Sequence, residues 1–157
     1  MAHNHDIDVL NSLITTTIDS ADGFERSAED AAAGRFQQLF REFAAERRRV
    51  VARLQEAVRG FGGTPNDDGS LAAGVHRRWV DLRAAITRND ADGGCDRAIV
   101  EEVERGEDWL KAKYDEALDD TALSREALDA IGDAYKSVRA GHDTASRLKH
   151  EMEGAPA

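Results

Sequence analysis

Long stretches of this sequence place apolar residues three and four positions apart, and proline interrupts almost none of them. The only prolines are Pro65 and Pro156, and proline is the residue that most strongly breaks a helix. Apolar residues at this spacing line one face of an α-helix. The pattern therefore predicts four long helices and one shorter helix. The long helices are expected at residues 6–32, 35–59, 95–118 and 124–152, and the short one at residues 70–88.

The segments between these helices predict how the helices are arranged. Asp6 and Ser124 stand at the starts of periodic segments and are expected to cap them. Residues 60–70, GFGGTPNDDGS, have the composition of a loop. This loop and the short helix after it can cross over, so that the helices on either side run parallel. The expected fold is an all-α, ferritin-like four-helix bundle with an additional short crossover helix.

Length and charge limit the class of protein further. The chain has 157 residues, which fits a single domain at 1–157, with an ordered core expected over about 6–150. The net charge of −10 disfavours nucleic acid and anionic membranes as partners. The sequence contains no apolar run long enough to predict a membrane span, and MAHNHDID does not resemble a secretion signal. Because Cys95 is the only cysteine and cannot form an internal disulfide, we expect a cytoplasmic protein.

Several polar residues fall where a bundle core should be apolar. His142 lies among the apolar positions of the last predicted helix, and Arg47 lies between Phe43 and Val50. In bundle cores, carboxylates and histidines from facing helices bind iron or manganese. The carboxylates that border the predicted apolar faces are Glu25, Glu29, Glu46, Glu104 and Glu107. The sequence therefore predicts a metal site, although it lacks the Glu-x-x-His motif that two-metal bundle sites use.

Arg47 and His142 also have purely structural interpretations. A bundle core tolerates an arginine when a neighbouring carboxylate pairs with its charge. The candidates for this pairing are Glu25, Glu29 and Glu107. His142 can likewise be a core histidine held by a hydrogen bond. The sequence leaves metal-ligand and ion-pair roles open for the inward carboxylates.

The stretch EEVERGEDWL, residues 101–110, contains five carboxylates and a glycine within one predicted helix. One interpretation is a solvated acidic face. In the other, Glu104 and Glu107 project together from one side of the helix, because they are three residues apart. Gly106 is less favourable than alanine here by roughly 1 kcal/mol. It indicates either the close approach of a neighbouring helix or a π-type bulge next to a site.

Four motifs occur in order along the chain: LNSLITTTIDSADGFERSAED, FGGTPNDDGSLAAGVHRRW, EVERGEDWLKAKYDEAL and AYKSVRAGHD. Together they resemble an uncharacterised bacterial family of four-helix-bundle proteins, which is grouped with the ferritin-like superfamily as a domain of unknown function. The resemblance implies a ferritin-like fold and a bacterial cytoplasmic protein. By analogy with metal-binding members of the superfamily, it implies Glu29, Glu104, Glu107 and His142 as ligands. His76, on the crossover helix, is a further candidate at one end of the bundle.

Two functional hypotheses follow from these observations. The first is a ferritin-like protein, linked to stress or metal handling, that binds iron or manganese in its core through Glu and His ligands. The missing Glu-x-x-His motif disfavours a ferroxidase-like activity. The alternative is a non-catalytic helical protein whose inward charges form ion pairs, and which acts by self-association into a homo-oligomer or through a protein partner. Arg47 at a core position favours this alternative. No nucleophile–base pairing or phosphate-binding glycine loop indicates another class of enzyme.

Overall fold

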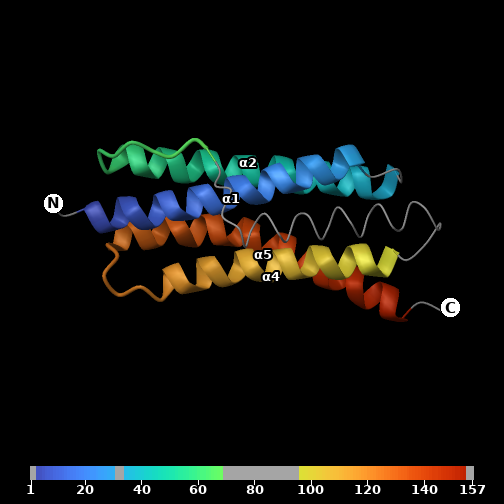
Figure 1. Cartoon of the computed structure of the whole chain (residues 1–157). Coiled ribbons are helices and arrows are strands. Elements are labelled where there is room, and N and C mark those ends of the chain that lie inside the picture. Colours follow the sequence, from blue (N-terminus) through green and yellow to red (C-terminus); the bar gives the residue numbers. More distant parts are fainter. Residues whose placement is uncertain (1–2, 31–33, 69–95, 155–157) are drawn as a thin grey trace.

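The structure, a computed structural model, describes residues 3–30, 34–68 and 96–154 and contains four α-helices within these ranges. They are α1 (Asn4–Asp30), α2 (Gly34–Gly60), α4 (Asp96–Leu118) and α5 (Arg125–Gly154) (Figure 1). The described ranges contain no strand. The prediction of an all-α four-helix bundle is therefore confirmed, with helix ends that agree to the usual accuracy of about two residues. The predicted short helix at 70–88, with His76, lies outside the described residues.

The helices form two antiparallel hairpins that pack side by side. α1 packs mainly against α2, and α4 packs mainly against α5, while contacts between α2 and α5 and between α1 and α4 join the two hairpins. Figure 1 shows that α2 and α4 run in the same direction along the bundle. This parallel arrangement is the one expected if a long crossover connects α2 to α4.

The core consists of two groups of apolar side chains. The larger group is built from all four helices and includes Leu10, Val50, Leu110 and Ile131. An aromatic group lies toward the C-terminal end of α1 and the N-terminal end of α2. There the ring centroid of Phe24 is 5.9 Å from that of Phe40 and 5.0 Å from that of Phe43. Each large side chain buried in this way contributes roughly 1.5–3 kcal/mol to stability. On α2, the boundary between the two groups falls at residue 47.

The starts of α1 and α5 meet through the side chain of Asp6. This carboxylate is 2% exposed, and its Oδ1 atom accepts a hydrogen bond of 2.8 Å from the backbone N–H of Ser124. Its Oδ2 atom lies 2.9 Å from Nδ1 of His3. Because α1 begins at Asn4, the prediction that Asp6 caps its own helix is wrong. Ser124 caps α5 as predicted, since its Oγ atom accepts a hydrogen bond from the backbone N–H of Ala127.

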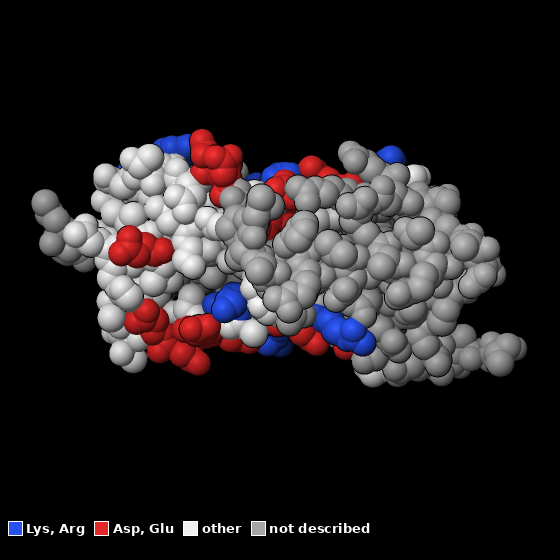
Figure 2. Space-filling model, in the orientation of Figure 1, with Lys and Arg blue, Asp and Glu red and all other residues white. Residues whose placement is uncertain are grey.

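Charged side chains border an uncharged area on the face shown in Figure 2. Asp and Glu side chains gather along the edges of this area, with Lys and Arg among them, at the end of the bundle where α1 begins. The helices in the described ranges include none with both the length and the apolar character of a membrane span.

Candidate functional site

An arginine and a glutamate form an ion pair in the middle of the bundle. Arg47 of α2 donates a hydrogen bond from Nη2 to Oε2 of Glu107 on α4. The two side chains are 0% and 1% exposed. Arg47 lies between Phe43 and Val50 on the buried face of α2, so the same helical register that buries these apolar side chains also buries the guanidinium. Of the pairings that the sequence left open for Arg47, the structure forms the one with Glu107.

Gly141 of α5 lies directly against this ion pair. A Cβ atom at residue 141 would be 2.6 Å from Nη2 of Arg47 and 3.0 Å from Oε2 of Glu107. Real Cβ atoms do not approach other atoms at the shorter distance, so a side chain at residue 141 would force the guanidinium of Arg47 to shift. Gly141 was not among the predicted site residues, and Gly106, which was singled out, lies within a continuous α-helical stretch of α4. The signal for Gly141 was a glycine three residues after Val138 on the apolar face of the last helix.

The ion pair leaves several buried polar atoms without a hydrogen-bond partner among the described residues. These atoms are Nε and Nη1 of Arg47, Oε1 of Glu107 and Nδ1 of His142. A buried polar atom without a partner destabilises a protein by about 1–3 kcal/mol. Burial raises the pKa of Glu107 above its ordinary value, and the neighbouring guanidinium opposes this rise only in part. The Arg47–Glu107 ion pair and the neighbouring His142 therefore have unused capacity to bind a further polar group.

His142 lies at the edge of the bundle and pairs with an aspartate. Its side chain is 20% exposed, and Nε2 contacts Oδ1 of Asp108 on α4. Its Nδ1 atom lies 3.6 Å from Oδ1 of Asp143. The histidine is close enough to Glu107 for its charge to lower the pKa of that carboxyl. Asp108, in the acidic stretch 101–110, is 55% exposed and also contacts His142.

Of the other predicted ligands, Glu25 and Glu46 pair with arginines other than Arg47. Oε2 of Glu25 lies 2.9 Å from Nη2 of Arg48 at the surface, and Oε2 of Glu46 lies 2.9 Å from Nε of Arg49. Glu104 is partly exposed on α4. The side chain of Glu29 and the whole of His76 lie outside the described residues. The structure therefore brings Glu107 and His142 together, but pairs Glu25 and Glu46 with arginines elsewhere.

These positions do not fit a metal centre within the described part of the chain. No three His, Cys, Asp or Glu side chains there come together in an arrangement that could hold a metal ion. Iron and manganese need several oxygen and imidazole ligands that point to one position. Here the guanidinium of Arg47 already pairs with Glu107. Metal binding that includes Glu29 or His76 stays a prediction.

Tyr114 and Thr17 form a second buried polar contact, between α4 and α1. The phenol oxygen of Tyr114 lies 2.7 Å from Oγ1 of Thr17, which donates its own hydrogen to the backbone carbonyl of Leu13. The phenol therefore donates to Thr17. Burial raises the pKa of Tyr114 to about 12, and the positive charge of Arg47 opposes this rise. Tyr114 is thus a neutral structural donor at physiological pH.

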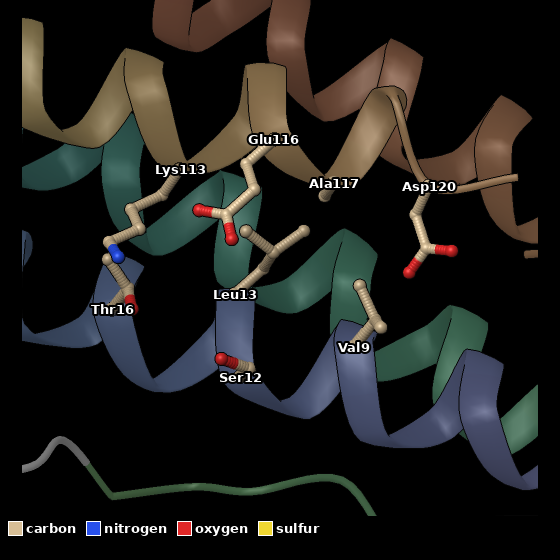
Figure 3. A pocket seen from close by; sticks show the side chains of 8 residues that line it. All are labelled: Val9, Ser12, Leu13, Thr16, Lys113, Glu116, Ala117 and Asp120. Carbon is tan, nitrogen blue, oxygen red and sulfur yellow. The ribbon is translucent and has the colours of Figure 1, made fainter. Parts of the chain in front are cut away.

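Two grooves between the helices are lined by described residues. The first, of about 200 Å³, lies between α1 and α4. Figure 3 shows Leu13 between the two helices there, with the side chains of Lys113 and Glu116 extending from α4 toward α1. The second, of about 460 Å³, lies between α2 and α5 and reaches Arg47 and Gly141. Of the two, the second adjoins a buried charged group with free hydrogen-bonding capacity.

Comparison with known proteins identifies the family of the chain. No curated protein matches it in sequence. The sequence profile described as "Domain of unknown function (DUF2383)" matches residues 5–120, which include α1, α2 and α4. The chain therefore belongs to the DUF2383 family of domains of unknown function.

Proposed function

We propose that this protein is a ferritin-like bundle with a non-catalytic role, in which a buried ion pair stands where a metal would otherwise bind. The observation that carries this proposal is the contact between Arg47 and Glu107, with both side chains at most 1% exposed. The parallel direction of α2 and α4 supports the ferritin-like assignment. The protein would act by self-association or through a protein partner, in the bacterial cytoplasm that the sequence predicts.

The physical argument concerns which cation compensates Glu107. A buried carboxylate needs a positive partner or a proton, because burial strongly disfavours an isolated charge. A divalent metal would require further carboxylates to face Glu107, whereas a guanidinium is compensated by the single carboxylate of Glu107. Glu25 and Glu46 pair with Arg48 and Arg49 instead. The buried charge of Glu107 is thus compensated by Arg47 without a metal.

The rival hypothesis is iron or manganese binding through Glu29, Glu104, Glu107 and His142. One observation favours it: Oε1 of Glu107 and Nδ1 of His142 are both buried without a hydrogen-bond partner. Such atoms are acceptors that a metal could use, provided that the proton of the neutral imidazole is on Nε2. In this hypothesis the resident metal would supply redox chemistry linked to stress or metal handling.

Metal content per chain decides between the two hypotheses. The protein would be purified without an affinity tag or chelator, loaded anaerobically with ferrous iron or manganese, desalted and subjected to elemental analysis. The ion-pair hypothesis predicts no stoichiometric metal in the wild type. One or two ions per chain, lost in Glu107→Gln and retained in Glu25→Gln, would overturn it and establish Glu107 as a ligand. Light scattering on the same samples gives the mass in solution, which separates self-association from action on a partner.

A further inference from the structure

The groove between α2 and α5 brings apolar surface and the buried guanidinium together. It has a volume of about 460 Å³, and its lining includes Phe43 and Arg47 of α2 and Ala140 and Gly141 of α5. This volume falls within the range of roughly 300–1,000 Å³ that is typical of sites for small molecules. Phe43 and Ala140 provide an apolar part of the lining, and Arg47 provides a positive charge.

Arg47 has hydrogen-bonding capacity that Glu107 does not use. A guanidinium carries five N–H donors. Nη2 donates to Oε2 of Glu107, while Nε and Nη1 are buried and have no partner among the described residues. A buried donor of this kind is satisfied only when an acceptor reaches it. An acceptor that approaches from the groove could take these donors while Glu107 keeps its own hydrogen bond.

Gly141 keeps the guanidinium free of a covering side chain. A Cβ atom at this position would lie 2.6 Å from Nη2 and 3.3 Å from Nη1 of Arg47. Any side chain larger than hydrogen would therefore occupy the space above the guanidinium, on the side of α5. Gly141 and Arg47 both line the groove, so no side chain of residue 141 stands between the groove and the guanidinium.

The other polar groups of the groove leave Arg47 as its principal donor. Oγ1 of Thr144 already donates to a backbone carbonyl of its own helix, at 2.9 Å. Burial would raise the pKa of Glu46, but the hydrogen bond and charge of Arg49 contribute to holding it below its ordinary value. The negative charge of Glu46 is thus compensated by Arg49. Lys136 at the rim is 81% exposed, and its Nζ atom lies 3.5 Å from Oδ1 of Asp133.

We propose that this groove binds a small monocarboxylate with a short hydrocarbon chain. A carboxylate is planar and carries two acceptor oxygens, which suit the free N–H groups of Arg47. The hydrocarbon chain would lie against Phe43 and Ala140. A phosphate, with its higher charge, would need more donors than the groove offers. The proposal goes beyond the structural role proposed above and requires neither a metal nor self-association.

The test observes Arg47 directly. Protein labelled with ¹⁵N would be freed of metal, and the Nε–H signal of Arg47 would be assigned by its loss in Arg47→Lys. Titration with sodium butanoate, in a buffer without carboxylates, should move this signal progressively to saturation. Sodium chloride at the same ionic strength and 1-butanol should not reproduce the saturable shift. No saturable shift with butanoate, or an equal shift with chloride, would overturn the proposal.

Matched variants locate the binding in the groove. Gly141→Ala should weaken butanoate binding at least tenfold, whereas Gly132→Ala, on the same helix with nothing within 4 Å of the added Cβ, should leave it unchanged. If Gly141→Ala does not fold, Ala140→Leu provides the test, because Ala140 is an exposed residue of α5 that lines the groove. Its larger side chain should also remove binding. Unchanged affinity in Ala140→Leu would refute the location. Because the titration uses metal-free protein, its outcome is independent of the metal analysis.

Discussion

Replacing Glu107 with glutamine tests whether the buried charge of Arg47 depends on the charge of Glu107. Glu107→Gln keeps the size of the side chain but leaves the guanidinium of Arg47, which is 0% exposed, without a compensating charge. Breaking a buried ion pair from one side destabilises a protein by about 3–5 kcal/mol. A domain of this length loses roughly 2–4 °C in Tm per kcal/mol. We therefore expect a fall of about 6–20 °C, measured by circular dichroism during thermal unfolding, with urea unfolding for the free energy.

Two controls make this result interpretable. Glu25→Gln removes a carboxylate that pairs with Arg48 at the surface, where the side chains are 50% and 40% exposed. Its loss should be within about 1 kcal/mol, as for other exposed ion pairs. The double variant Arg47→Met with Glu107→Leu removes both charges and should recover most of the stability lost in Glu107→Gln. If Glu107→Gln is no more harmful than Glu25→Gln, the argument that Arg47 depends on the Glu107 charge is wrong.

Three further predictions follow from the packing of the described residues. Gly141→Ala should lower the free energy of unfolding by about 1–3 kcal/mol through overpacking, whereas Gly132→Ala, whose Cβ meets nothing within 4 Å, should not; urea unfolding of both variants compares them. Thr17→Val should destabilise the fold by about 1–3 kcal/mol, measured by urea unfolding, because the buried phenol of Tyr114 loses its hydrogen-bond acceptor. The pKa of Asp6 lies below its ordinary value of 3.8, because hydrogen bonds outweigh the raising effect of burial, so its contribution is present above pH 3.8 and is lost as the pH falls below it. Asp6→Asn should therefore be less stable than the wild type at pH 7, and the difference should shrink on acidification; a constant difference across this range would contradict the argument.

The sequence was sufficient for the helices because the signal for each one is local. Apolar residues three and four positions apart define a helix face, and Ser124 identifies the start of α5 because its side-chain oxygen accepts a hydrogen bond from the first turn. The same reasoning placed Arg47 on a buried face, because Phe43 and Val50 flank it. The role of Asp6 could not be predicted from neighbouring residues. Its carboxylate bonds to the backbone of Ser124, which is 118 residues away in sequence.

The sequence by itself thus determined which residues face the core, and the tertiary structure decided which of them meet. Glu25, Glu29 and Glu107 all bordered predicted apolar faces, and sequence spacing could not choose which one pairs with Arg47. The choice depends on the rotation and axial position of α2 against α4, which set Glu107 in contact with Arg47. The importance of Gly141 followed only from the tertiary structure, in which the backbone of α5 packs against the ion pair. Helix formation follows from interactions within a few residues, whereas the match between charges on different helices follows from packing the whole bundle.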